Sequence, residues 1–316
     1  MRLFLGVDGG QSSTKALIGD DAGRVLGAGI GGPCNHAGAA EGREKLARAV
    51  RESVAAACAQ AKLDMQQIHF DSACFGMSGG PEDKQAILSE ILPAARLIVT
   101  HDALIALSGA TAGEPGVITI SGTGSIAFGR NAEGETARAG GWGFLFGDEG
   151  SGFDIVRQAV RAALRFEEGW GPETALHRVL VAEAGARDAN DLMHGFYTED
   201  WPRPRVSLMA KTVDSVALDG DRVAREILLN AAQQLATLAV SVRRRLFGPE
   251  EAAPVCYIGG VFRSRLLQER FRQLVELEEG SRVAPARYEP AAGALLEAYR
   301  AAGLHRALSQ ISELKT

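Results

Sequence analysis

Apolar runs of strand length alternate along the chain with longer segments whose apolar residues recur at helical spacing. Strands are predicted at residues 3–7, 16–18, 25–28, 70–76, 96–100, 117–120, 126–130, 136–139, 255–258 and 282–284. Helices are predicted at residues 41–62, 81–92, 103–112, 153–166, 218–247, 262–274 and 290–302. Residues 167–206 contain three prolines and no regular pattern, so we expect an irregular segment there. Strands that alternate with helices in this way are typical of the α/β class.

The same order of turns occurs twice along the chain. In each half, a strand enters a turn rich in Gly, Ser and Thr, a second strand returns, and a third strand follows an acidic turn that contains Gly. The first turn covers residues 8–15 in one half and residues 121–125 in the other. We interpret the halves as two copies of one unit of three strands plus helices, which predicts two α/β domains. The last predicted helix, residues 290–302, is expected to pack on the first domain.

Composition narrows the classes of function. The chain has 316 residues, a net charge of −5 and a pI of about 5.8, which argues against a broad nucleic-acid surface. The four cysteines show no CxxC spacing, which argues against a structural zinc site and fits a reducing cytosol. No segment reaches the roughly 18 apolar residues of a membrane span, and no signal-peptide pattern is present, so we expect a cytoplasmic protein without a membrane partner. The one tight basic cluster, Arg243-Arg244-Arg245, is expected to be a solvated helix end.

Three glycine-rich turns follow predicted strands: Gly9-Gly10, Gly122-Thr123-Gly124 and Gly259-Gly260. A strand that ends in Gly presents backbone N–H groups at the carboxyl end of the sheet, where open α/β sheets bind ligands. Three such turns in two similar halves predict a nucleotide bound in a cleft between the domains. The chain has neither a Walker A loop nor a dinucleotide-binding fingerprint, so this is a different kind of nucleotide site.

Acidic residues stand next to these turns. Asp8 directly follows an apolar strand and precedes Gly9-Gly10, a position that favours a functional role. Asp102 follows the strand at residues 96–100 and is well placed to be the N-cap of the next helix. Between residues 140 and 152, six of thirteen residues are Gly, which indicates close backbone approach or positive φ. A flexible loop is the other interpretation of that segment, but its aromatic residues are poor linker residues.

These motifs resemble those of the N-acetylglucosamine kinases, members of the BadF/BadG/BcrA/BcrD ATPase group within the superfamily of sugar kinases, actin and heat-shock chaperones. The motifs that carry the resemblance are, in order, Gly6-Val7-Asp8-Gly9-Gly10 with Thr14, Asn35-His36, Thr100-His101-Asp102-Ala103, Ile120-Ser121-Gly122-Thr123-Gly124-Ser125, Gly141-Trp142-Gly143, Gly147-Asp148-Glu149-Gly150-Ser151 and Gly259-Gly260. The resemblance implies two ribonuclease H-like (actin-like ATPase) domains of the α/β class with a nucleotide cleft between them. It implies a first domain of residues 1–113, completed by a C-terminal helix at 289–316, and a second domain of residues 114–288.

The resemblance also implies a role for each matching residue. Asp102 would be the catalytic base, and Asp8 would hold Mg²⁺ through water. The residues that would bind ATP are Gly9, Gly10, Ser12, Gly122, Thr123, Gly259 and Gly260. The residues that would line the sugar pocket are Asn35, His36, Ser125, Gly141, Trp142 and Asp148. The implied activity is ATP-dependent phosphorylation of the 6-hydroxyl of N-acetylglucosamine, and the implied assembly is a homodimer.

Other functions remain open at this stage. The acceptor sugar could be glucosamine, because the same pocket could omit the acetyl group. The protein could instead be an ATPase that activates a partner dehydratase, but the cysteines that bridge such activators around an iron–sulfur cluster have no counterpart between Cys74 and Cys256. A non-catalytic sugar sensor is a third alternative, which the presence of Asp102 disfavours.

Each candidate residue also has a structural alternative. Asp102 could be only a helix N-cap, and Glu149 could cap the helix that begins at residue 153. Asn35 and His36 could be ordinary loop residues. Trp142 could be part of the hydrophobic core, which is compatible with shaping a pocket.

Overall fold

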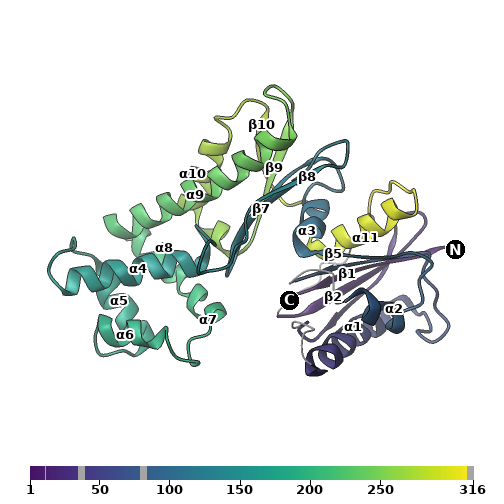
Figure 1. Cartoon of the computed structure of the whole chain (residues 1–316), viewed down its shortest axis with the longest axis horizontal. Coiled ribbons are helices and arrows are strands. Elements are labelled where there is room, and N and C mark those ends of the chain that lie inside the picture. The colour runs from purple at the N-terminus through teal and green to yellow at the C-terminus, as the bar shows by residue number, and fades with distance from the viewer. Residues whose placement is uncertain (11, 35–39, 79–83, 312–316) are drawn as a thin grey trace. The chain divides into compact units, whose positions relative to one another are not determined.

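The chain folds into two compact units. A computed structural model describes residues 1–10, 12–34, 40–78 and 84–311. Unit 1 consists of Met1–Glu114 with Ala286–Thr316, and unit 2 consists of Pro115–Pro285. Each unit contains a five-stranded sheet with helices packed on it (Figure 1). The predicted α/β class is therefore confirmed.

The sheet of unit 1 has the strand order β3-β2-β1-β4-β5. Its strands are β1 (Leu3–Gly9), β2 (Thr14–Asp20), β3 (Val25–Gly31), β4 (Ser72–Met77) and β5 (Leu97–His101). Strands β1, β2 and β3 form an antiparallel meander, whereas β1, β4 and β5 run parallel. The helices of this unit are α1 (Ala40–Ala61), α2 (Gln85–Ile91), α3 (Asp102–Ala110) and α11 (Pro290–Ala301).

Both faces of this sheet are covered, because side chains alternate along each strand. Helices α1 and α2 cover one face of the sheet, and α3 and α11 cover the other (Figure 1). Leu5 and Val7 pack in one core with residues of α1 and α2, while Phe4 packs in another with residues of α3 and α11. Gly6 allows α11 to approach β1 directly, since a Cβ there would lie 2.2 Å from the backbone nitrogen of Leu295. The last helix therefore packs on the first sheet, as the sequence predicts.

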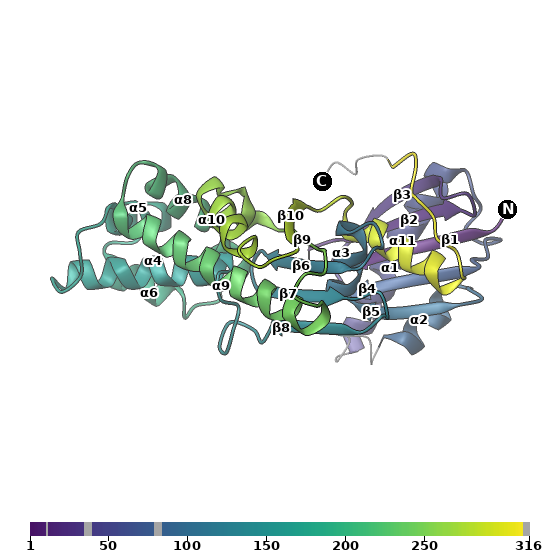
Figure 2. The same cartoon turned by 90° about the horizontal axis from the view of Figure 1, so that it is seen from above.

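Unit 2 repeats the same topology. Its strands are β6 (Gly116–Ser121), β7 (Ser125–Arg130), β8 (Thr136–Gly140), β9 (Ala253–Ile258) and β10 (Ser281–Pro285), in the order β10-β9-β6-β7-β8. Here β6, β7 and β8 are the antiparallel meander, and β6, β9 and β10 run parallel. Figure 2 shows each set of strands in its order. The internal repeat inferred from the turns is thus a repeat of topology.

Helices fill most of the long connection between β8 and β9. They are α4 (Gly152–Glu167), α5 (Ala175–Ala184), α6 (Ala189–Gly195), α7 (Arg203–Leu208), α8 (Ala210–Leu218) and α9 (Arg222–Leu246), and η1 (Gly260–Arg263) and α10 (Arg265–Val275) follow β9. The expectation of an irregular segment at residues 167–206 was wrong, because α5, α6 and α7 are too short for a clear period. The long pattern at 218–247, which the sequence allowed to be one helix or two, is the single helix α9 after Leu218, the last residue of α8. Gly220, with a φ of 99°, separates α8 from α9, and Asp221 caps α9.

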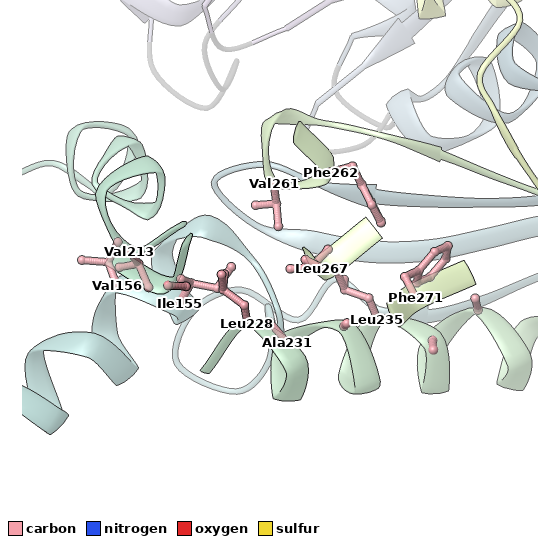
Figure 3. Close-up of a cluster of buried hydrophobic side chains, with 14 of the residues drawn as sticks. Ile155, Val156, Val213, Leu228, Ala231, Leu235, Val261, Phe262, Leu267 and Phe271 are labelled. Atoms are coloured by element: carbon pink, nitrogen blue, oxygen red, sulfur yellow. The ribbon is translucent and has the colours of Figure 1, made fainter. Parts of the chain in front are cut away.

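One hydrophobic core joins these helices to the second sheet. Ile155 of α4, Val213 of α8 and Leu228 of α9 point toward one another in Figure 3. Phe262 and Phe271 meet edge to face at 5.1 Å between ring centroids, which fastens η1 and α10 to the same core. In the described ranges, no helix combines the length and apolar character needed to cross a membrane.

Arg243 is buried, and the expectation that the cluster at 243–245 is a solvated helix end was wrong for this residue. Its guanidinium donates hydrogen bonds to the backbone carbonyls of Phe247, Gly248, Pro249, Glu251 and Glu279, at 2.7–3.5 Å. Carbonyls at the end of a helix lack partners within the helix, and a fixed guanidinium fork can satisfy several at once. Arg243 therefore joins the end of α9 to the segments before β9 and β10.

Replacing Arg243 with Ala should lower the free energy of unfolding by about 3–5 kcal/mol, because several buried carbonyls would lose their donor. Arg243→Lys should lose much of the same stability, since an ammonium cannot reach all the carbonyls. Urea denaturation followed by circular dichroism measures both. Arg245→Ala, at an exposed neighbour, is the control, with an expected change within about 0.5 kcal/mol. Equal effects at Arg243 and Arg245 would contradict the anchoring role.

Candidate active site

Two acidic residues of unit 1 lie at the carboxyl ends of its parallel strands, which form one edge of the sheet. Asp8 of β1 lies in register with Gly76 of β4, which lies in register with Thr100 of β5. Asp102 follows at the end of β5 as the first residue of α3. The two carboxylates predicted to act in the reaction therefore lie at the carboxyl ends of β1 and β5, on either side of β4, where open α/β sheets bind their ligands.

Asp102 is not the N-cap of its helix, contrary to the sequence-based expectation. His101 takes that position, and its Nδ1 accepts a hydrogen bond from the backbone N–H of Leu104 at 3.2 Å. The side chain of Asp102 is exposed, and within the described ranges its one hydrogen bond comes from Ser78 Oγ, at 2.9 Å to Oδ2. The N-cap role of Asp102 is thereby excluded, since another residue caps the helix.

Ser78 is a residue that the sequence analysis did not single out. Its backbone N–H donates to the carbonyl of Gly9 at 3.3 Å, while its hydroxyl holds Asp102. Ser78 therefore links the turn after β1 to the start of α3. The glycines that follow Ser78 in the sequence could have signalled such a role, because Gly also follows the strands before the other predicted turns.

The electrostatics at this edge are unfavourable for two ionised carboxylates. Burial, followed by repulsion from the charge of Asp102, raises the pKa of Asp8 from 3.8 to about 7. Lys15 of β2, which lies opposite Asp8 in the register of β1 and β2, opposes this rise in the pKa, while Glu289 adds to it. Lys15 in turn is bound by Glu289, with 2.9 Å between Nζ and Oε2. A cation near Asp8 would relieve this repulsion.

The turn after β1 is built around its two glycines. A Cβ on Gly9 would lie 2.3 Å from the sulfur of Met77, so a larger residue there would have to displace that side chain. Gly10 closes the turn by donating its N–H to the carbonyl of Ser13 at 3.1 Å. Ser12 is exposed, and among the described residues its N–H donates to no backbone carbonyl. Of these turn residues, Ser12 therefore offers the donor best placed to meet an anion.

In unit 2, the turn after β9 lies against the end of β6. Gly259 follows β9 with a φ of 118°, and a Cβ there would lie 2.0 Å from the carbonyl oxygen of Ser121. Gly259 is therefore required by the fold. Around Gly122 and Gly260, in contrast, a Cβ would meet no described atom within 4 Å. The protein does not need glycine at those two positions for its own packing, which is expected where a ligand approaches the backbone.

Gly122, Thr123 and Gly260 line one cavity of about 260 Å³ in unit 2. Thr123 and Ser207 share a hydrogen bond between their hydroxyls, at 3.2 Å. The other walls come from residues that the sequence analysis did not select: Ile155, Leu208, Ala210, Lys211, Asp214, Leu228, Val261, Arg263 and Ser264. Most of these residues lie in α4, α7, α8 and α9, far from the glycine turns in sequence, whereas Val261, Arg263 and Ser264 closely follow Gly260.

Three of the predicted sugar-pocket residues also lie together in unit 2. Asp148 is buried, with a φ of 61°, and its Oδ1 accepts the backbone N–H of Ser125 at 3.2 Å. Gly141 donates its N–H to the carbonyl of Ser125 at 3.0 Å. Arg203 approaches the other carboxylate oxygen of Asp148 at 3.7 Å and is a further residue that sequence reasoning missed. A left-handed aspartate held in this way is a feature typical of functional sites.

Trp142 lies beside this group but is not part of the core. Its side chain is 63% exposed, with the guanidinium of Arg138 4.5 Å from its ring centroid. Glu149 does not cap α4, because the hydroxyl of Ser151 accepts the N–H of Asp154 in that position. Asn35 and His36 lie outside the described residues.

The donor set at the edge of unit 1 fits a magnesium ion rather than a metal held by protein ligands alone. Among the described residues, no group of three or more His, Cys, Asp or Glu side chains surrounds a common position. Mg²⁺ is commonly held by one or two carboxylates together with waters and substrate phosphates. Asp8, with its raised pKa beside Asp102, suits that pattern.

The paired topology and the glycine turns at the parallel strand ends define an α/β protein of the ribonuclease H-like, actin-like ATPase class. The chain belongs to the BadF/BadG/BcrA/BcrD ATPase family, whose model matches residues 5–298. It is 32% identical to the N-acetylmuramic acid/N-acetylglucosamine kinase of Clostridium acetobutylicum, over 88% of this chain and 91% of that protein. It is 31% identical to the N-acetyl-D-glucosamine kinase of Dictyostelium discoideum, over 93% and 97%.

A solved structure agrees with these relatives. The structure of a candidate N-acetylglucosamine kinase from Chromobacterium violaceum matches with a TM-score of 0.74 and 27% sequence identity. The match covers 94% of this chain and 98% of that one. The similarity therefore extends over both units.

Replacing Asp8 with Asn should stabilise the protein at pH 8 in the absence of metal and nucleotide. The folded state holds the Asp8 proton more tightly than the unfolded chain, so wild-type stability falls as the pH rises from about 4 to about 7. Asn cannot ionise and escapes that loss. The expected gain at pH 8 is about 1–3 kcal/mol, since one pKa unit corresponds to about 1.4 kcal/mol and solvent screens part of the effect.

Urea denaturation in EDTA between pH 4 and pH 8 measures this difference. The gain should disappear near pH 4, where wild-type Asp8 is protonated in the folded protein. Glu44→Gln, at an exposed position on α1, is the control and should show no such pH dependence. An Asp8→Asn protein no more stable than wild type at pH 8 would contradict the electrostatic account.

Proposed function

We propose that this protein is an ATP-dependent hexosamine kinase that phosphorylates the 6-hydroxyl of N-acetylglucosamine, with Asp102 as general base. The observation that carries the proposal is the exposure of Asp102 at the start of α3, next to Asp8, while His101 caps the helix. The two relatives that act on N-acetylglucosamine support the choice of acceptor.

In the proposed reaction, Asp102 accepts the proton of the sugar hydroxyl as that oxygen attacks the γ-phosphorus of ATP. The bond from the γ-phosphorus to its bridging oxygen breaks, and ADP leaves. Ser78 fixes Oδ2 of Asp102, which orients the carboxylate toward the incoming hydroxyl. Bound Mg²⁺ would spread the negative charge of the β- and γ-phosphates, and Asp8 would hold it through water.

Residues of both units are proposed to bind the nucleotide. The cavity beside Gly122, Thr123 and Gly260 is proposed to take the nucleoside, because the open space at its two glycines admits a ligand to the backbone. The N–H groups of Ser12 and Thr123 suit the phosphates, since among the described residues neither donates to a backbone carbonyl. Gly9, Gly10 and Gly259 are proposed to shape these turns.

The sugar is proposed to bind at Asp148, with Ser125, Gly141 and Trp142 around it. A carboxylate can accept hydrogen bonds from two vicinal hydroxyls, and the N–H of Ser125 already orients Asp148. Trp142 exposes an aromatic face, which suits contact with the apolar face of a sugar ring. Asn35 and His36 are proposed to complete the pocket.

Activation of a partner dehydratase is less well supported. The four cysteines, Cys34, Cys58, Cys74 and Cys256, are all buried. Burial raises the pKa of each thiol, which disfavours the thiolates that ligate iron.

A coupled assay of ADP release, with N-acetylglucosamine, N-acetylmuramic acid, glucosamine and glucose as acceptors, tests the proposal. N-acetylglucosamine should give the highest kcat/KM. A higher kcat/KM for glucosamine would make the protein a glucosamine kinase, and the absence of sugar-dependent turnover would remove the proposal. Asp102→Asn should lower kcat by about 10²–10⁴-fold while calorimetry still detects sugar binding. An Asp102→Asn enzyme with wild-type kcat would contradict the role of Asp102 as base.

Ser78→Ala should lower kcat by about 3–10-fold, because one hydrogen bond that orients the base is lost. Steady-state kinetics measure this effect. Ser89→Ala, at an exposed position on α2, is the control and should keep the wild-type kcat. A Ser78→Ala enzyme with wild-type kcat would contradict a role through Asp102.

A further inference from the structure

A second cavity, of about 270 Å³, lies in unit 1 at the far end of α3 from Asp102. It is lined by the segment that follows α3, by the start and end of α11, and by the segment at residues 304–307. Asp102 is the first residue of α3, and a helix of nine residues extends about 14 Å. The cavity is therefore separate from the carboxylates proposed to act in catalysis.

Three arginines gather around this cavity. Arg287, Arg300 and Arg306 line it together with His305, and Glu114 is the acidic residue among the lining residues that the structure describes. The chain as a whole carries a net charge of −5, so this concentration of basic groups is local. An arginine fork matches the geometry of phosphate oxygens, and several forks around one space are typical of phosphate recognition.

Among the described residues, Arg287 and Arg306 are held in place by groups other than carboxylates. Arg306 donates hydrogen bonds to the backbone carbonyls of Asp21 and His305, at 2.8 and 3.2 Å. The guanidinium of Arg287 lies 5.3 Å from the ring centroid of Tyr288. In the part of the chain that the structure describes, neither arginine forms an ion pair with an acid. Their charges are thus oriented but not neutralised by a carboxylate.

The cavity also has apolar walls. Tyr288, Leu296 and Leu304 contribute side chains of the core that α11 forms with the first sheet. A bare inorganic anion would leave those walls without a partner. Basic groups next to apolar walls in a small cavity fit a small organic phosphate, whose phosphate meets the arginines and whose carbon skeleton meets the walls.

Both connections between the units border this cavity. The chain leaves unit 1 after Glu114 and returns to it at Ala286, and the lining includes residues 112–114 and 287–288. Ala112 and Gly113 adopt successive positive φ angles of 57° and 86°. Arg300 donates a hydrogen bond to the carbonyl of Gly113, so a group that lines the cavity also holds this connection.

We infer that this cavity is a binding site for a small organic phosphate and that its occupancy stiffens the two connections between the units. Arg287 belongs to the connection that returns to unit 1 at Ala286, and Arg300 holds Gly113 in the connection that leaves unit 1 after Glu114. An anion bound by Arg287, Arg300 and Arg306 would therefore link the two connections. The site is distinct from the sites proposed for ATP and sugar, and it does not depend on the kinase proposal.

Calorimetric titration with glycerol 3-phosphate, without ATP or sugar, tests the site. The double variant Arg287→Glu/Arg306→Glu should bind at least tenfold more weakly than wild type. The control variant Arg48→Glu/Arg51→Glu changes charge equally at exposed positions of α1 and should bind like wild type. Arg287→Gln alone, which keeps Arg306 and its backbone contacts, should weaken binding by at least threefold even if the double variant folds poorly. Wild-type affinity in the folded Arg287 variants would overturn the site.

Hydrogen–deuterium exchange tests the coupling. Amides at residues 110–116 and 284–289 should exchange more slowly in wild type with glycerol 3-phosphate, and the effect should be lost in the Arg287→Glu/Arg306→Glu protein. Binding without protection of these two segments would overturn the proposed stiffening. Because neither measurement uses turnover, failure here and failure of the kinase proposal are separate results.

Discussion

The parallel register of β1, β4 and β5 places Asp8 and Asp102 at the same end of the sheet, where burial of Asp8 and then repulsion from Asp102 raise the pKa of Asp8. A pKa of about 7 at Asp8 means that the folded protein disfavours the ionised form of this carboxylate. Such an arrangement suits the proposed site for Mg²⁺, whose charge would offset that of the two carboxylates. The proposed kinase chemistry depends on this feature.

The repeated topology gives each unit a glycine-rich turn at the end of the first strand of its meander. In unit 1 the turn after β1 lies beside Ser78, and in unit 2 the turn after β6 lies beside Gly259. The two turns differ in why they contain glycine. Met77 fills the space beside Gly9, whereas the space beside Gly122 is open. One turn is therefore fixed by packing, and the other leaves room for a ligand.

Much of the fold could be predicted from sequence, because its strands are β-branched apolar runs between glycine-rich turns. The short helices α5, α6 and α7 were missed, since helices of this length carry too few residues for a period to show. The same limit applies to the site. Asp8 stands beside a recognisable turn, but Ser78 and Arg203 act through contacts across the fold that no local pattern records. His101 competes with Asp102 as a cap, and residue preference alone favours Asp.

A structure with N-acetylglucosamine and a non-hydrolysable ATP analogue bound would test the central claim most directly. The account predicts the sugar 6-hydroxyl within about 3 Å of the Asp102 carboxylate, with the terminal phosphate next to that hydroxyl. It also predicts the nucleoside beside Gly122 and Gly260. A sugar bound out of reach of Asp102, or a nucleotide bound away from these turns, would contradict it.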